Sequence, residues 1–233
     1  MSPRVAKHTD QTFESELSEV RERILLMGAH VEDLIAGSIR ALVERDSDLS
    51  RATIDADREI DELELSIDEL CLRVLARRQP VASDLRFIAT SLKLVTDLER
   101  MADVGVNICE RVLELNEEAP LRPYVDLVNM AEVAQGMVRE ALDAFVDRDA
   151  MRARNVLVRD DVLDAHYDQT FRELLTYMME DPRNIYRATR IQSVAKYLER
   201  IGDHATNVAE MVVFMIDGED IRHARRREPP RQR

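Results

Sequence analysis

The sequence predicts an all-α protein made of two tandem, pseudo-symmetric three-helix bundles. The composition supports the helical class: 45% of the 233 residues are hydrophobic and 34% are charged, but only 4% are aromatic, with 6 Gly and no Trp. Few chain breakers and few aromatic residues are typical of helical proteins. Two further observations, the proline positions and an internal repeat, divide the chain into its helices and its two halves.

The prolines mark where helices end. Proline lacks a backbone N–H and its ring clashes with the preceding turn, so it is costly inside a helix. Internal prolines occur at positions 80, 120, 123 and 182. We therefore expect helices in the proline-free segments 4–79, 81–119, 124–181 and 183–228.

The two longer segments each contain a break and are expected to form helical hairpins. The breaks lie near Asp46-Ser47-Asp48 and near Asp147 to Asp149, because Asp and Ser side chains bond to nearby backbone N–H groups and favour caps and turns. Each hairpin is followed by one shorter helix. The expected domains are a first bundle over 10–119, a second over 120–221, and a basic tail over 222–233.

An acidic stretch of the first half recurs in the second. Residues 98–110 read "LERMADVGVNICE" and residues 198–210 read "LERIGDHATNVAE", with Leu, Glu, Arg, Asp, Asn and the closing Glu in the same places. The hairpins align at a constant spacing as well, with Val43, Asp46, Asp57 and Asp61 matching Val146, Asp149, Asp160 and Asp164. The chain is therefore a tandem duplication of a unit of about a hundred residues.

Apolar residues at three- and four-residue steps predict the core faces of the hairpin helices. In the first half these residues are Ile24, Leu25, Val31, Leu34, Ile35, Ile39 and Leu42. In the second half they are Leu163, Tyr167, Phe171, Leu174 and Met178. Such stripes usually pack into the core, and we expect both to be buried.

Beside the apolar stripes, carboxylates recur at four-residue spacing, which places them about 40° apart on a helix. Glu199, Asp203, Asn207 and Glu210 share one face, as do their counterparts Glu99, Asp103, Asn107 and Glu110. The hairpins carry two further pairs, Asp57 with Asp61 and Asp160 with Asp164. If the second and third helices of each bundle are neighbours, each half presents two carboxylate pairs on adjacent helices.

Two interpretations of these carboxylates stay open. Like charges at this spacing repel each other by a few tenths of a kcal/mol per pair, and a hard cation such as Mg²⁺, Mn²⁺, Ca²⁺ or iron would remove that repulsion through oxygen ligands. Alternatively, the face is simply solvated or paired with Arg100, Arg111 and Arg200, which lie on the same polar side. Because the same spacing occurs at matching positions in both halves, the metal and the structural interpretations are about equally well supported.

The sequence offers little support for catalytic chemistry, so we expect that the protein is not an enzyme. Di-iron bundles use Glu-x-x-His ligands, but neither acidic stretch has a His three residues after its Glu, and His204, opposite Val104, reads as a surface or packing residue. The glycines are too scattered for a phosphate-binding loop, and no nucleophile motif is visible. Cys71 and Cys109 lack metal-type spacing, so we expect buried reduced thiols.

The charge distribution disfavours nucleic acid. The formal net charge is −13, although the tail "RHARRREPPRQR" is basic, so the body is more acidic still and lacks the cations that bind phosphate backbones. It suits cations or basic partners instead. No apolar run is long enough to cross a bilayer and the N-terminus has no apolar signal region, so we expect a soluble, cytoplasmic protein.

Three motifs resemble the signatures of the PhoU family of phosphate-transport regulators. They are "QPVASDLRF" (residues 79–87), "LERMADVGVNICERV", and "KYLERIGDHATNVAEMV" followed by "DGED". The resemblance covers residues 10–220. It implies two symmetric three-helix bundles, a homodimer, and repression of phosphate uptake and of the phosphate-starvation response through a phosphate ABC transporter and its sensor histidine kinase.

The resemblance also implies metal clusters on E/D-x-x-x-D motifs. Matched by position, the ligands would be Asp57, Asp61, Glu99, Asp103, Asp160, Asp164, Glu199 and Asp203. The first repeat departs from the fuller motif, with Ala102 for Gly202 and Val104 for His204. Contact with the membrane would come only through the transporter ATPase and the kinase. The competing function is a metalloenzyme or metal store, which the missing His ligand disfavours.

Overall fold

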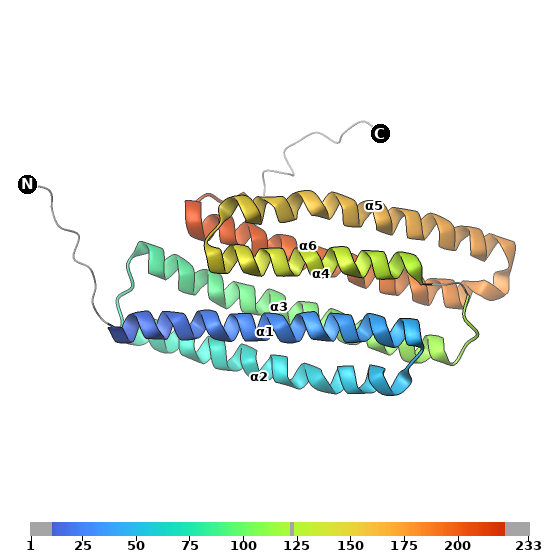
Figure 1. Ribbon diagram of the computed structural model, residues 1–233, viewed down its shortest axis with the longest axis horizontal. Helices are drawn as coiled ribbons and strands as arrows, with labels where there is room; N and C mark the ends of the chain where they lie inside the picture. The colour runs from blue at the N-terminus through green and yellow to red at the C-terminus, as the bar shows by residue number, and fades with distance from the viewer. Residues whose placement is uncertain (1–10, 122–123, 222–233) are drawn as a thin grey trace, which may run out of the picture.

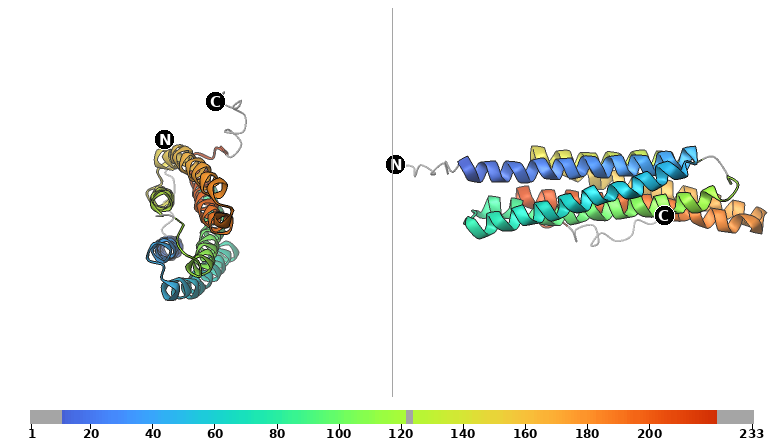
Figure 2. Two further views of the ribbon diagram at one scale, coloured as in Figure 1. Left: turned by 90° about the vertical axis from the view of Figure 1, so that its right-hand side faces the viewer. Right: turned by 90° about the horizontal axis from the view of Figure 1, so that it is seen from below.

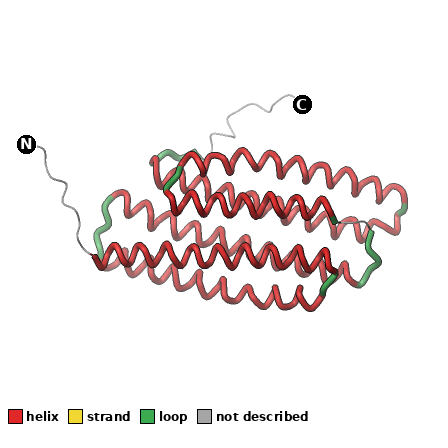
Figure 3. The backbone as a smooth tube through the Cα atoms, in the orientation of Figure 1, coloured by secondary structure: helices red, strands yellow, loops and turns green. Residues whose placement is uncertain are grey.

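A computed structural model describes residues 11–121 and 124–221 of the chain. Helices joined by short loops make up this part of the chain, and the backbone tube contains no strand in it (Figure 3). The elements are α1 (Gln11–Glu44), α2 (Ser47–Arg77), α3 (Ala82–Asn116), α4 (Val125–Asp147), α5 (Ala150–Glu180), the 3₁₀ turn η1 (Pro182–Asn184) and α6 (Ile185–Asp217). The helices thus lie between the prolines and the hairpin breaks, as predicted.

The breaks inside the two hairpins have the same construction. The Asp46 carboxylate accepts hydrogen bonds from the backbone N–H groups of Asp48 and Leu49 at 2.9 Å, which caps the start of α2. Asp149 caps α5 in the same way. The preceding residues, Arg45 and Arg148, have left-handed backbone angles, φ 56° and 53°. The duplicated turn chemistry therefore fixes both hairpins.

The six helices form two bundles lying side by side (Figure 1). Helices α1, α2 and α3 pack together, as do α4, α5 and α6. The bundles meet where α3 lies against α6 and α1 against α4, and the end-on view shows these two contacts on opposite sides of the molecule (Figure 2). Helices α2 and α5 touch only helices of their own bundle, so each keeps a broad exposed surface.

The predicted core stripes are mostly buried, with two errors. Ile24, Val31, Leu34, Ile35, Ile39 and Leu42 are buried, as are Leu163 and Leu174. Leu25 and Phe171, however, are 38% and 41% exposed, while Tyr167 and Met178 are partly buried. Helix α5 packs only on α4 and α6, so the stripe predicted from spacing is wider than the face that its neighbours cover.

Both cysteines are buried and free of disulfides, as predicted. Burial raises the pKa of the Cys71 thiol to about 12 and that of Cys109 to about 11. The Cys109 backbone carbonyl accepts a hydrogen bond from the Ser50 hydroxyl at 2.9 Å, which ties α3 to α2. Thiols held in the neutral form inside a core are unreactive, so both residues serve packing.

Polar contacts hold the end of α3 within its own bundle and against the second one. The guanidinium of Arg45, in the turn between α1 and α2, donates to the Leu115 carbonyl at 2.9 Å. Across the bundles, Arg190 of α6 forms an ion pair with Glu114 of α3, and Arg187 donates to the Ala119 carbonyl at 3.0 Å. These last two contacts hold the connection between the bundles. None of the described helices combines the length and apolar character that a membrane span requires.

Candidate functional site

In the first bundle, the predicted carboxylates of α2 and α3 face each other across the helix pair. The pKa of Asp57 is raised from 3.8 to about 6, chiefly by burial, and then by the negative charges of Asp61 on the same helix and Asp103 on α3. Mutual repulsion of this kind requires the carboxylates to lie close together. The structure therefore brings the two sequence motifs of this half onto one surface.

Two further acids on α2 belong to the same surface. The pKa of Glu99 is raised by burial first, and then by Asp103 and Glu64. The pKa of Glu64 is itself raised by burial and by Asp68. We call Asp57, Asp61, Glu64, Asp68, Glu99 and Asp103 the first acidic face. Our sequence reasoning missed Glu64 and Asp68, although they continue the spacing of Asp57 and Asp61 by one and two turns.

The second bundle repeats this arrangement on α5 and α6. Burial raises the pKa of Asp164, and the charges of Glu199, Asp161 and Asp168 raise it further. The pKa of Asp203 is raised by burial and then by Glu199, with a smaller contribution from Asp164. We call Asp160, Asp161, Asp164, Asp168, Glu199 and Asp203 the second acidic face.

The glycine of the second motif lets α5 approach α6 closely. A Cβ atom on Gly202 would lie 2.3 Å from Leu163 Cδ2 and 3.6 Å from Asp160 Oδ1. Residue 202 therefore sits directly beneath Leu163, and the absence of a side chain brings Asp160 against the α6 backbone. The first bundle has Ala102 at the equivalent position, so the two motifs differ at the residue that faces the neighbouring helix.

A lysine distinguishes the second acidic face from the first. The Lys196 ammonium forms an ion pair with Glu199 and lies 5.4 Å from the centre of the Tyr167 ring. Burial alone would lower the pKa of Lys196, but the Glu199 hydrogen bond and nearby acids raise it. In this arrangement of side chains Glu199 is therefore paired with a basic residue, as the structural interpretation expects, but the residue is a lysine and not an arginine.

His204 lies in the contact between the bundles. Its Nδ1 atom is 2.8 Å from Asp97 Oδ1 on α3, and the Asn207 amide donates to the same oxygen at 3.2 Å. The side chains of His204 and Asp97 are 14% and 17% exposed. His204 is therefore a packing residue with a specific polar partner. Sequence reasoning missed Asp97 because it lies two residues before Glu99, on a different side of α3 from the recognised spacing, and its partner is on the other bundle.

The donor atoms suit a hard cation, although they are not gathered into a finished site. Both faces offer carboxylate oxygens, the ligands that Mg²⁺, Ca²⁺ and Mn²⁺ prefer. Within residues 11–121 and 124–221, no three His, Cys, Asp or Glu side chains converge closely enough to hold a metal ion. The eight predicted ligands are thus grouped by bundle, and coordination would need side-chain rotation, including separation of Lys196 from Glu199.

The repeated sequence that carries these two faces matches a known domain. The family model described as the PhoU domain matches residues 24–112 and again residues 127–212. The chain belongs to the PhoU family. The two matched PhoU regions lie one in each bundle, which confirms the duplication and the two-bundle fold. The boundaries at 119 and 221 stay predictions, and the basic tail lies outside the described residues.

PhoU relatives from several bacteria are similar over nearly the whole chain. A phosphate-specific transport system accessory protein PhoU homolog from Pseudomonas putida is 45% identical over 217 residues, which is 93% of this chain and 85% of the relative. The PhoU of Escherichia coli K12 is 36% identical over 93% of this chain and 90% of its own length. These relatives are named as accessory proteins, and the family is not a catalytic one, which confirms the non-enzymatic prediction.

Two solved PhoU structures have the same fold. The crystal structure of PhoU from Pseudomonas aeruginosa superposes with a TM-score of 0.85 at 44% identity, covering 89% of this chain and all of that one. PhoU from Streptococcus pneumoniae, described as a phosphate transport system regulatory protein, superposes with a TM-score of 0.81 at 29% identity, covering 89% and 98% of the two chains.

Proposed function

We propose that this PhoU protein represses phosphate uptake and the phosphate-starvation response by contacting a phosphate ABC transporter, through its ATPase, and the associated sensor histidine kinase. The observation that carries this proposal is the similarity of both bundles to relatives named as phosphate-specific transport system accessory proteins. The protein would act by binding rather than by catalysis. It would work in the cytoplasm as a homodimer and would reach the membrane only through these partners.

The acidic faces are the surfaces that we propose for cation binding within this function. Both lie on pairs of packed helices, α2 with α3 and α5 with α6. The proposed ligands are Asp57, Asp61, Glu99 and Asp103 in the first bundle, and Asp160, Asp164, Glu199 and Asp203 in the second. A bound divalent or iron-type cation would neutralise part of the repulsion and hold each helix pair in one arrangement.

The regulatory role can be tested by deleting the gene. Cells that lack the protein should express phosphate-scavenging genes in phosphate-rich medium, because the repressing contact is lost. Reporter activity and intracellular phosphate would be measured together, with the wild-type gene restored on a plasmid as the control. Normal repression in a strain that also lacks any second copy of the gene would contradict the proposal.

The location can be tested by fractionating cells. The protein should sediment with membranes in cells that contain the transporter and kinase, and stay in the soluble fraction when both are absent. The proposal predicts this because the protein itself supplies no membrane contact. Membrane association that persists without these two partners would contradict it. Light scattering of the purified protein tests the homodimer in the same preparation.

A further inference from the structure

An open groove runs along the seam between α3 and α6. Its larger part has a volume of about 430 Å³ and is lined on α3 by Leu92, Lys93, Thr96, Asp97 and Arg100, and on α6 by Asn207, Glu210 and Met211. A smaller part of about 80 Å³ adjoins it and shares Lys93 and Met211. The combined space falls in the range of small-molecule sites.

The α3 wall of the groove carries two cations that form no ion pair among the described residues, although the positive charge of Arg100 opposes the rise in the pKa of Glu99 and Glu64 on the first acidic face. Lys93 and Arg100 both line the groove, and they lie on one face of α3 because seven residues make nearly two helical turns. Within the described part of the chain neither residue takes part in an ion pair of 4.0 Å or less, whereas Arg111 of the same helix does. An acidic protein leaves two positive charges facing an open space here.

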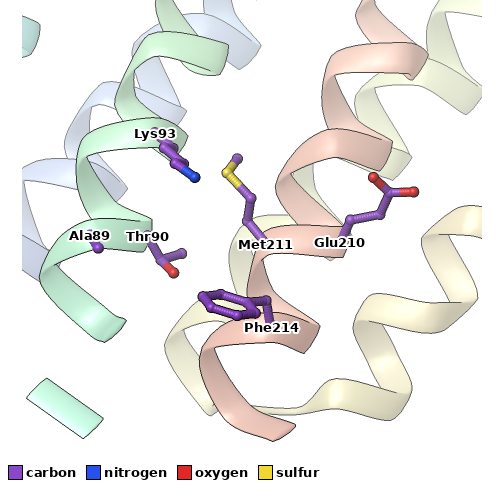
Figure 4. Close-up of a pocket in the computed structure, with 6 residues that line it drawn as sticks. All are labelled: Ala89, Thr90, Lys93, Glu210, Met211 and Phe214. Atoms are coloured by element: carbon purple, nitrogen blue, oxygen red, sulfur yellow. The ribbon is translucent and has the colours of Figure 1, made fainter. Parts of the chain in front are cut away.

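Two acids also line the groove, Asp97 and Glu210. The Asp97 carboxylate accepts a hydrogen bond from Asn207 and contacts His204. Figure 4 shows the Lys93 side chain pointing into the space beside Met211, while the Glu210 carboxylate points away from it on the far side of α6. The groove therefore carries charges of both signs, and Lys93 is a cation directed into its open space.

The other end of the groove is apolar. Met211 and Phe214 come from α6, and the Phe214 ring lies at the edge of the smaller part of the space (Figure 4). Phe214 is 39% exposed, so one side of its ring is open to a ligand. A planar or apolar group could rest on this ring and on the Met211 thioether.

The duplication shows that these features are not a general consequence of the fold. In the equivalent half of the seam, Arg111 and Glu114 replace Met211 and Phe214, and they form an ion pair of 3.0 Å. Ser193 replaces Lys93. Of the two equivalent halves of the seam in the described residues, one combines an apolar end with cations that form no ion pair.

We propose that this groove binds a phosphorylated small molecule with a planar or apolar end, the class to which nucleoside diphosphates belong. Lys93 and Arg100 contact the phosphates, and Met211 and Phe214 contact the planar end. The site goes beyond the proposed regulatory function and does not depend on it, because it uses none of the proposed metal ligands and no protein partner. It gives the protein a way to respond to a metabolite.

The test is a calorimetric titration of the full-length protein with ADP, adenosine and inorganic phosphate in chelator, so that no metal bridges the nucleotide to the acidic faces. ADP should bind more tightly than either fragment. The double variant K93A/R100A should weaken ADP binding by about tenfold or more, because each cation makes a charge-assisted contact. The control pair R58A/R200A removes two exposed arginines and the same charge, and should change the affinity by less than about twofold.

A third variant separates the groove from general charge effects. T96F fills the groove and keeps every charge, and it should also weaken ADP binding by about tenfold. Circular dichroism confirms that each variant is folded. The proposal is overturned if wild-type protein does not bind ADP at about 1 mM, if phosphate binds as tightly as ADP, if T96F binds normally, or if both double variants lose affinity equally. Because the titration needs no transporter or kinase, its failure leaves the regulatory proposal standing.

Discussion

Asp57 shows how the fold sets the chemistry of a single residue. Its carboxylate is partly buried beside Asp61 and Asp103, and its pKa rises from 3.8 to about 6. A raised pKa means that the folded protein holds the proton more tightly than the unfolded chain does. The stabilising contribution of the protonated form is therefore complete below about pH 4 and is lost as the pH rises through about 6.

We expect the Asp57→Asn variant to reveal this linkage. In chelator, the variant should be more stable than wild type at pH 7, where Asp57 is charged and repelled, and the difference should shrink toward zero near pH 4. Urea unfolding between pH 4 and 7.5 measures it. Asp55→Asn, an exposed position on the same helix, is the control and should show no such trend. A difference that is constant with pH would contradict the electrostatic origin.

Glu199 and Asp203 provide the test of the metal assignment. Replacing them with Gln and Asn keeps their size and removes two charges, so bound metal should fall after identical loading, as measured by elemental analysis. Thermal stability in chelator should stay within about 0.5 kcal/mol, because relief of repulsion offsets the loss of the exposed Lys196 pair.

The matched control for that pair is E62Q/E69Q, which removes two exposed acids outside both faces. It should leave the metal content unchanged. The equivalent variant of the first bundle, E99Q/D103N, shows whether the two faces bind independently. Unchanged metal stoichiometry in E199Q/D203N would falsify the ligand assignment for this pair, and a lower melting temperature in chelator would support a purely structural role.

At the scale of elements, each hairpin depends on one capping aspartate. Asp149→Ala should cost about 1 kcal/mol of the free energy of unfolding, because two N–H groups at the start of α5 lose their acceptor. Asp46→Ala should cost a similar amount at α2. Urea denaturation measures both. Asn at either position keeps an acceptor oxygen and should restore stability to within a few tenths of a kcal/mol; an equal loss with Asn would show that capping is not the cause.

At the scale of the whole molecule, the contacts that join the bundles contribute unequally to the free energy of unfolding. Asp97 is largely buried between His204 and Asn207, whereas Glu32 of α1 meets an Arg139 side chain that is 64% exposed. We expect Asp97→Ala to cost about 1 to 2 kcal/mol, since it leaves two partners unsatisfied. Glu32→Ala should cost less than about 1 kcal/mol. Urea unfolding of both variants tests the ranking, which equal costs would contradict.

Patterns along the chain determined most of the secondary structure and the duplication. Prolines, capping aspartates and apolar spacing act over a few residues, so the helix boundaries and the turns at Asp46 and Asp149 follow from local chemistry. The register of the repeated acids also follows from helical geometry alone, which is why the membership of both acidic faces could be predicted in large part.

Only the tertiary structure decided which side chains meet across helices. The exposure of Leu25 and Phe171 depends on which part of each helix its neighbours cover. The contact of His204 with Asp97 and the groove between α3 and α6 depend on how helices from the two bundles pack. Crossing and rotation of packed helices are set by side chains far apart in the sequence. A repeat therefore predicts two similar bundles, but the role of each difference between them depends on helix packing: Lys196 lies over Tyr167 of α5, and Met211 lines a groove because α3 lies against α6.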